Sequence, residues 1–299
     1  MITRDQLRGT GTALVTPFKQ DGSIDFESLH KLINFNIDGG VEYLVVLGTT
    51  GETPVLSLDE KKAVLEFTLK ANDGKLPVVA GVGGNNTHGV IKEMEALPMH
   101  DVSAVLSASP YYNKPSQEGI YQHYKAIAEA SLKPVILYNV PGRTGSNVTA
   151  ETTLRLSKVA NICGIKEASG NMVQCMHIMR DKPEDFLVVS GDDHLAFPLI
   201  AMGMDGVISV ASNCFPKEFS EMVRAALDGN LYQARILHNQ LVGCFDLLFA
   251  ENNPAGVKAF LTELGMIQNN FRLPLVPLSE ALHKKVKAYL SKGEPEVQG

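Results

Sequence analysis

The sequence predicts an α/β protein, a closed (β/α)8 TIM barrel followed by a C-terminal helical appendage. Eight short runs rich in Val, Ile and Leu recur along the chain, as buried parallel strands do. Helical patterns separate the runs, which indicates successive βαβ units, and eight such units close into a barrel. An open doubly wound sheet is disfavoured, because the first run leads into Thr16-Pro17-Phe18 rather than a G-x-G-x-x-G phosphate loop.

The eight apolar runs are the expected strands of the barrel. In chain order they cover residues 12–15, 43–47, 78–82, 104–106, 135–138, 162–165, 187–189 and 207–210. After the second run, Ser57 and Glu60 have the spacing of a capping box. Leu58, Leu65 and Leu69 then follow on one face, which predicts that this face of the helix packs on the barrel.

Helix boundaries after the fifth and eighth runs are marked by capping residues. Thr149 is the expected N-cap of a helix that runs toward residue 160. Pro216 begins the helix after the eighth run, and Gly229 ends it. We therefore expect a catalytic barrel over residues 1–228.

Residues 229–299 show only helical patterns and form the expected C-terminal helical region. One amphipathic stripe follows three- and four-residue spacing: Ala234, Leu237, Leu241, Cys244 and Leu248. Pro254 begins a second helix and Gly265 ends it, and a third covers about residues 279–290. We expect these helices to pack on the barrel.

The composition excludes several classes of protein. The 299 residues include 33 acidic and 27 basic ones, and the net charge of −6 argues against a nucleic-acid-binding surface. No apolar run approaches the ~20 residues that span a bilayer, and the first residues lack the apolar stretch of a signal peptide. The four cysteines have neither C-x-x-C nor zinc-finger spacing, so we expect buried free thiols. These features predict a soluble, cytoplasmic protein without a nucleic-acid or membrane partner.

Polar residues gather directly after the expected strands, where a barrel of this type carries its chemistry. They occupy positions 48–52, 83–85, 109–113, 138–143, 166–167, 190–193 and 209. One end of the barrel therefore collects hydroxyls, phenols, a lysine and an arginine among flexible glycines.

Lys166 is the most informative of these residues. It ends the sixth run, so its aliphatic stem is expected in the mouth of the barrel. Burial there disfavours the charged ammonium, and a neutral amine can attack a carbonyl to form a Schiff base. The alternative is a structural ion pair, for example with Glu167. The position alone leaves both interpretations open.

Other residues at this end allow an anion site and a proton shuttle. Tyr138 can move a proton, or it is an ordinary core tyrosine with its hydroxyl paired. The turn at residues 48–51 can bind a carboxylate with its N–H groups, or it is a plain Gly-rich strand exit. Arg143 offers a bidentate fork for a carboxylate, or a surface ion pair. Asp192 and Asp193 indicate a turn or helix cap rather than a metal site, because no third ligand has suitable spacing.

Six motifs in this order resemble one family over nearly the whole chain. They are GTTGE at 48–52, SPYYNKP at 109–115, YNVPGRTG at 138–145, GIKEASG at 164–170, SGDD at 190–193 and GVISVASN at 206–213. The chain resembles the class I pyruvate-dependent aldolases, the family that includes dihydrodipicolinate synthase and N-acetylneuraminate lyase. GTTGE rather than GSTGE, together with Arg143, resembles the synthase branch, because the sialic acid lyases lack that arginine.

The resemblance implies a Schiff-base mechanism that needs no metal or organic cofactor. Lys166 forms an imine with pyruvate, whose carboxylate lies in the turn of Thr49 and Thr50, with Thr50 donating its hydroxyl. The resulting enamine attacks the aldehyde of L-aspartate semialdehyde, whose carboxylate pairs with Arg143. Transimination by the amine of the substrate then gives 4-hydroxy-tetrahydrodipicolinate, the committed step of diaminopimelate and lysine biosynthesis.

The resemblance also implies a shared proton relay and an oligomer. Tyr138 transfers protons and is linked through Thr49 to Tyr112, which a neighbouring subunit contributes. The backbone near Gly191 and Ile208 lines the pocket. The family is usually a homotetramer built from two tight dimers, so we expect at least a dimer.

Two further implications concern regulation and substrate. Lysine-sensitive relatives hold lysine with a histidine pair and a glutamate, but this chain has Leu58, Lys61 and Gly89 at those places, although Asn85 and Tyr111 are kept. We therefore expect weak or absent inhibition by lysine. The alternatives to the synthase are an N-acetylneuraminate lyase or related pyruvate aldolase with another aldehyde, and a non-catalytic metabolite sensor. A pure binding protein has no use for a Schiff-base lysine.

Overall fold

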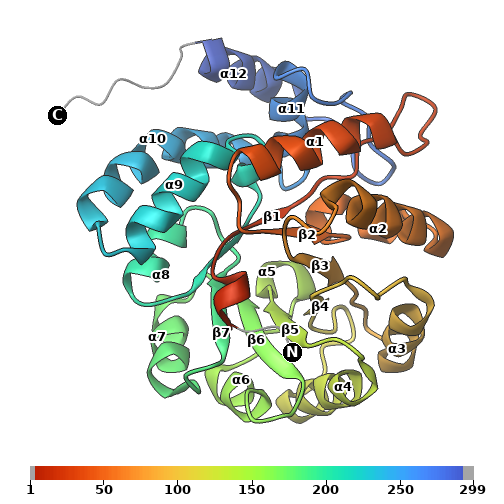
Figure 1. Ribbon diagram of the computed structural model, residues 1–299, viewed down its shortest axis with the longest axis vertical. Coiled ribbons are helices and arrows are strands. Elements are labelled where there is room, and N and C mark those ends of the chain that lie inside the picture. The colour runs from red at the N-terminus through yellow and green to blue at the C-terminus, as the bar shows by residue number, and fades with distance from the viewer. Residues whose placement is uncertain (1–3, 292–299) are drawn as a thin grey trace.

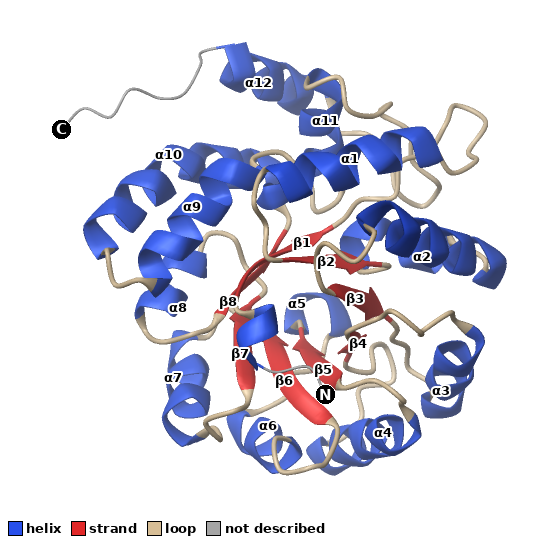
Figure 2. Ribbon diagram, viewed as in Figure 1, coloured by secondary structure: helices blue, strands red, loops and turns tan. Residues whose placement is uncertain are grey.

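Eight parallel strands close into a barrel surrounded by helices, as the sequence predicts (Figures 1 and 2). The computed structural model describes residues 4–291. Each strand pairs with the next along the chain, and β1 closes the barrel against β8. The strands are β1 Gly9–Ala13, β2 Tyr43–Val46, β3 Val78–Gly81, β4 Ala104–Ala108, β5 Val135–Asn139, β6 Ile162–Glu167, β7 Leu187–Ser190 and β8 Gly206–Ser209.

Helices follow the strands and cover the outside of the barrel (Figure 2). The α-helices of the barrel are α1 Phe26–Asp38, α2 Leu58–Asn72, α3 Thr87–Ala96, α4 Gln117–Ala130, α5 Pro141–Thr144, α6 Ala150–Leu156, α7 Met172–Asp181, α8 Ala196–Ala201 and α9 Pro216–Leu227. Short 3-10 turns are η1 Arg4–Leu7, η2 Thr49–Gly51, η3 Thr53–Val55 and η4 Ala211–Asn213. No helix in the described part of the chain has the length and apolar character of a membrane span.

The first strand begins three residues earlier than the apolar run at 12–15 predicts. Gly11 pairs with Tyr43 in register, and a Cβ on Gly11 would lie 2.1 Å from the Tyr43 ring. The strand therefore consists of glycine, threonine and alanine where it passes under a large ring. A search for apolar runs misses such a strand, because its residues are small enough to pack against Tyr43 and are not strongly hydrophobic.

Capping residues begin the helices where the sequence places them, with one correction. Ser57 and Glu60 form the complete capping box of α2, and the Thr149 hydroxyl caps α6. Leu65 is fully buried on the face of α2 that packs on the barrel. Leu58, expected on that face, is exposed at the first position of the helix.

The barrel interior and the layer outside it form separate apolar clusters. The interior cluster includes Tyr43, Val45, Tyr138 and Ile208, and Leu7 of η1 belongs to it. Neighbouring strand residues such as Leu44 and Val46 point outward, into the larger cluster beneath the helices. This alternation is the two-residue period of a strand, and it directs Tyr138 inward.

Three helices after the barrel pack beside α9 and α1 (Figure 1). They are α10 Leu231–Phe249, α11 Ala255–Glu263 and α12 Glu280–Ser291. The predicted stripe on α10 faces inward, with Ala234, Leu241, Cys244 and Leu248 buried.

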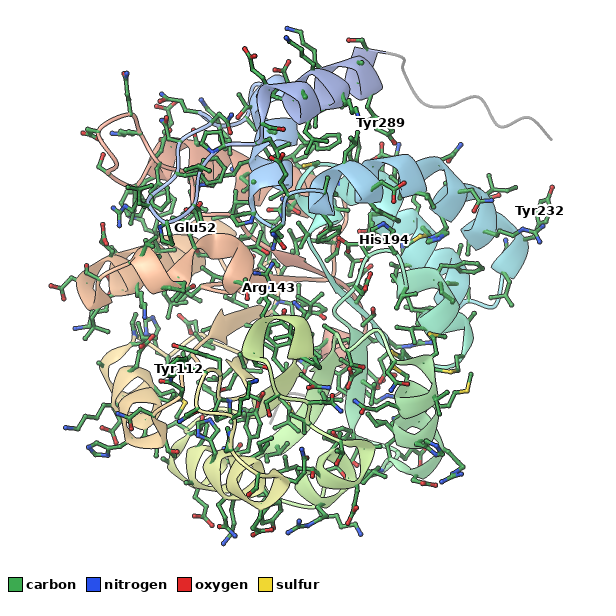
Figure 3. All side chains as sticks on the ribbon, turned by 180° about the vertical axis from the view of Figure 1, so that it is seen from behind. Glu52, Tyr112, Arg143, His194, Tyr232 and Tyr289 are labelled. Atoms are coloured by element: carbon green, nitrogen blue, oxygen red, sulfur yellow. The ribbon has the colours of Figure 1, made fainter. Side chains whose placement is uncertain are left out.

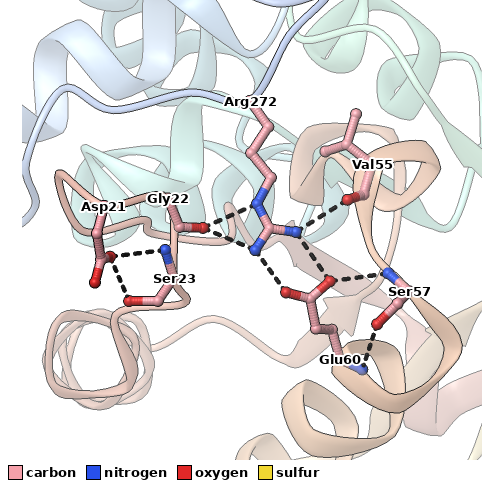
Figure 4. Close-up of polar contacts among 7 residues, drawn as sticks. All are labelled: Asp21, Gly22, Ser23, Val55, Ser57, Glu60 and Arg272. Atoms are coloured by element: carbon pink, nitrogen blue, oxygen red, sulfur yellow. Dashed lines mark hydrogen bonds and ion pairs between the residues drawn. The ribbon is translucent and has the colours of Figure 1, made fainter.

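A group of hydrogen bonds around Arg272 attaches the segment between α11 and α12 to the barrel (Figure 4). Arg272 donates to the Glu60 carboxylate at 2.5 Å and to the carbonyls of Gly22 and Val55. Glu60 also completes the capping box by accepting from the Ser57 N–H. The Arg272 guanidinium lowers the pKa of Glu60 to about 2, so this carboxylate stays ionised at all ordinary pH values.

Candidate active site

A cavity of about 770 Å³ opens at the carboxyl ends of the strands. Side chains that follow β2, β5, β6 and β7 line it, as the barrel argument predicts. The last residue of α10, Phe249, and Asn253 in the segment after it also line the cavity. The cavity wall therefore combines the barrel with the C-terminal helical region.

Lys166 and Tyr138 lie together on the inner wall of this cavity. They are register partners on β6 and β5, and the Lys166 amine lies 4.4 Å from the centre of the Tyr138 ring. Lys166 is 6% exposed. A Cβ on Gly191 would lie 2.9 Å from Lys166 Cε, so the lysine stem packs where only glycine leaves room. A largely buried amine with a phenol beside it suits carbonyl chemistry.

Glu167 is bound by neutral donors and not by Lys166. Its carboxylate accepts from the Asn139 amide at 3.0 Å, the Gln174 amide at 3.1 Å and the Ser169 N–H at 2.7 Å. These bonds join β5, β6 and α7 behind the Lys166–Tyr138 pair. Within residues 4–291, Lys166 forms no ion pair with Glu167 or with another carboxylate, so the structure does not support the interpretation of Lys166 as a structural ion pair.

The turn after β2 places Thr50 at the cavity wall. Leu47 and Glu52 adopt left-handed backbone conformations on either side of the η2 turn, which reverses the chain sharply. Thr50 is 2% exposed, and its hydroxyl oxygen accepts from the Asn253 amide at 2.8 Å. Thr49 precedes it and also lines the cavity. The turn that the sequence analysis expects to bind a carboxylate is thus held in place by the hydrogen bond from Asn253.

A buried ion pair lies directly behind this turn. Glu52 and Lys258 of α11 pair with both side chains 0% exposed. The Lys258 amine also donates to the Asn270 carbonyl at 2.9 Å and lies 4.4 Å from the Phe18 ring centre. Burial raises the pKa of Glu52 and lowers that of Lys258, and their mutual attraction opposes both shifts.

Arg143 lies at the mouth of the cavity on the short helix α5 (Figure 3). Its Nη2 donates to the Asn253 carbonyl at 3.2 Å. This hydrogen bond is to a neutral carbonyl, so it differs from the surface ion pair that the sequence analysis gave as the alternative for Arg143. The guanidinium keeps its positive charge available to an anion in the cavity.

The two aspartates after β7 serve different roles. Asp192 lines the cavity, and its carboxylate accepts from the His194 N–H at 3.0 Å. Asp193 is buried and accepts from the N–H groups of Val210 and Ala211. Burial raises the pKa of Asp193 to about 6. Asp192 thus forms the predicted turn, whereas Asp193 does not cap the following helix α8 and instead binds the backbone after β8. Within residues 4–291, no group of His, Cys, Asp and Glu side chains is arranged to hold a metal ion.

Two expected site residues lie outside the cavity wall of the single chain. Tyr112 is 87% exposed (Figure 3), and its neighbour Tyr111 lines the cavity instead. Ile208 belongs to the interior cluster below the cavity, and Val210 forms the wall at this strand end. Gly191 lies where expected.

The sequence reasoning missed several residues that line the cavity. They are Lys61, Glu93, His194, Phe249 and Asn253. Lys61 and Glu93 form an ion pair at 2.8 Å. Lys61, Glu93, Phe249 and Asn253 do not follow an expected strand, so the strand-end criterion gave no signal for them, whereas His194 lies just beyond the segment considered after the seventh run.

The chain matches the model of the "Dihydrodipicolinate synthetase family" over residues 6–293. It is 54% identical to a 4-hydroxy-tetrahydrodipicolinate synthase of Flavobacterium psychrophilum over 94% of this chain and 96% of the relative. A protein of the same name from Parabacteroides distasonis is 51% identical over 95% and 96%. Dihydrodipicolinate synthase from Thermotoga maritima aligns with a TM-score of 0.94 at 43% identity, covering 96% of this chain and 98% of that one.

Proposed function

This chain belongs to the dihydrodipicolinate synthetase family, and we propose that it condenses pyruvate with L-aspartate semialdehyde to give 4-hydroxy-tetrahydrodipicolinate. That reaction is the committed step of diaminopimelate and lysine biosynthesis, and the enzyme is a lyase. The observation that carries the proposal is the Lys166 amine, buried at the cavity wall beside the Tyr138 ring.

Lys166 attacks the ketone of pyruvate, and loss of water leaves a protonated imine. The pyruvate carboxylate lies against the Thr49–Thr50 turn, where the Thr50 hydroxyl donates to it. The imine withdraws electrons from the adjacent methyl group, so a methyl proton leaves and an enamine forms. The imine is itself the electron sink, and the step calls on no further cofactor.

Tyr138 moves the protons that imine formation and breakdown require. Its ring contacts the Lys166 amine, so the phenol is within the reacting region. We propose that Thr49 links it to Tyr112 of a second subunit. The exposure of Tyr112 supports this proposal, because the side chain is free to reach outside its own chain.

The enamine carbon attacks the aldehyde of the second substrate, whose carboxylate pairs with Arg143 at the cavity mouth. Arg143 suits this role because its only bond within the described chain is to a neutral carbonyl. The substrate amine then displaces Lys166 from the imine and closes a six-membered ring. In this proposal, the backbone of Gly191 and the chain from Ile208 to the cavity-lining Val210 complete the pocket.

Beyond the reaction, we propose a homotetramer built from two tight dimers. Residues 1–228 form the catalytic barrel in this proposal, and 229–299 form the helical region that packs on it. A cytoplasmic location is supported by the four free cysteines, which are typical of a reducing compartment.

The experiment that tests the function compares two aldehydes with the purified protein. We expect kcat/KM to favour pyruvate with L-aspartate semialdehyde over pyruvate with N-acetylmannosamine, and Arg143→Ala to remove that preference. Turnover with the sugar alone would assign the chain to the N-acetylneuraminate lyase branch. Borohydride trapping of pyruvate on Lys166, read by mass spectrometry, tests the imine independently of the aldehyde.

A further inference from the structure

Asn253 contacts both of the residues that anchor the two substrates, although it lies far from them in the sequence. Its Nδ2 donates to Thr50 Oγ1 at 2.8 Å, and its backbone carbonyl accepts from Arg143 Nη2 at 3.2 Å. The residue is 6% exposed and lines the cavity between α10 and α11. One residue of the C-terminal region thus joins the pyruvate side of the cavity to the aldehyde side.

The contact with Asn253 determines which way the Thr50 hydroxyl can donate. A threonine hydroxyl has one proton and two lone pairs. The Asn253 amide occupies a lone pair of Thr50 Oγ1, so the hydroxyl proton must point elsewhere. Thr50 is buried at the cavity wall, and the proton is therefore available to an acceptor in the cavity.

We propose that Asn253 is a positioning residue that makes Thr50 a hydrogen-bond donor to the carboxylate of the 2-oxo acid. Its main-chain carbonyl meanwhile holds Arg143 for the carboxylate of the amino aldehyde. This inference rests on the function proposed above. An amide fits the position because its nitrogen only donates, whereas an ionised carboxylate only accepts and repels the pyruvate carboxylate.

The variant Asn253→Asp tests the direction of this hydrogen bond. It takes the donor away from Thr50, and the loss of a bond to a charged group predicts a rise of about 10- to 100-fold in the KM for pyruvate. The KM for the aldehyde changes less, because the backbone contact with Arg143 remains. Asn252→Asp places the same charge on the exposed neighbouring residue and is expected to behave as the wild type. A wild-type KM for pyruvate in Asn253→Asp would overturn the proposal.

A double-mutant cycle tests whether Asn253 acts through Thr50. Asn253→Leu removes the amide at similar volume, and we expect it to raise the KM for pyruvate several-fold. In a Thr50→Val background the same change is expected to have no further effect, because the hydroxyl that it positions is gone. Additive effects would show that Asn253 acts on the fold in general and would refute the positioning role.

The proposed function fails separately from this inference. Wild-type protein that forms no borohydride-stable adduct with pyruvate would contradict the Schiff-base function itself. Wild-type protein that forms the adduct, with Asn253→Asp saturating at the same pyruvate concentration, would contradict only the role of Asn253. A proportional rise in both KM values with an unchanged kcat would also refute it, because the expected effect is confined to pyruvate.

Discussion

Removing one partner of the buried Glu52–Lys258 pair is expected to destabilise the fold, including the turn after β2. Lys258→Met removes the cation that pairs directly with Glu52, and both side chains of the pair are fully buried. Removing one partner of a buried ion pair costs about 3–5 kcal/mol, because the other charge stays buried without compensation. We expect the free energy of unfolding to fall by about that amount.

The loss in Lys258→Met is expected to depend on pH. Burial already raises the pKa of Glu52, and without Lys258 only the weaker attraction of Arg272 opposes that shift. A carboxyl group whose folded-state pKa lies above its unfolded value is destabilising once pH exceeds the unfolded pKa. The penalty of Lys258→Met is therefore larger at pH 8 than at pH 5, where Glu52 takes up a proton at lower cost.

Urea unfolding followed by circular dichroism, at one protein concentration, measures this penalty. Glu52→Gln/Lys258→Met removes both charges, so it is expected to recover part of the loss, although the Asn270 carbonyl still lacks its donor. Lys31→Met breaks an exposed pair with Glu27 and is expected to leave stability unchanged. A loss below ~1 kcal/mol in Lys258→Met, with no pH dependence, would refute the reasoning.

Further results are expected for the mechanism, the pH dependence, inhibition by lysine and the oligomer. Lys166→Ala abolishes turnover and borohydride trapping, and Tyr138→Phe lowers kcat by roughly 10²-fold, whereas an unchanged kcat would remove Tyr138 from the mechanism. The difference in the free energy of unfolding between Asp193→Asn and the wild type is expected to change by about 1 kcal/mol in favour of the variant from pH 5 to pH 7. The reason is that the wild-type carboxyl group, with its pKa near 6, must ionise while buried. A difference that stays constant between these pH values would contradict this prediction. Free lysine does not inhibit below the millimolar range, because Gly89 offers no carboxylate and Glu93 already pairs with Lys61. Protein diluted to monomers loses activity if Tyr112 completes a neighbouring site, and a fully active monomer would exclude that role.

The regular parts of the fold could be predicted because strand and helix signals are local. Seven apolar runs coincide with strands to within two residues, and the capping residues Ser57 and Thr149 begin their helices as expected. β1 was misplaced because its residues fit beneath Tyr43 rather than forming an apolar run. That constraint comes from a neighbouring strand, so no window of sequence contains it.

The site residues also divide into those that local sequence signals predict and those that only contacts between distant segments bring together. Lys166, Tyr138 and Thr50 sit where their strands end, so the period of the strands and the geometry of a barrel place them. Asn253 reaches Thr50 across 203 positions of sequence, and only the packing of α10 and α11 on the barrel brings them together. Neither the composition nor the spacing around residue 253 carries that information.

Tyr112 extends this argument beyond one chain. Its backbone adopts a φ of 71°, which a bulky residue rarely holds unless its surroundings require it. Its own chain supplies few surroundings, because 87% of the residue is exposed. A large exposed aromatic ring with this backbone conformation, beside a cavity that its neighbour Tyr111 lines, supports the proposed contact of Tyr112 with a second copy of the chain. The proposed proton relay assigns this exposed tyrosine to the site of the partner subunit.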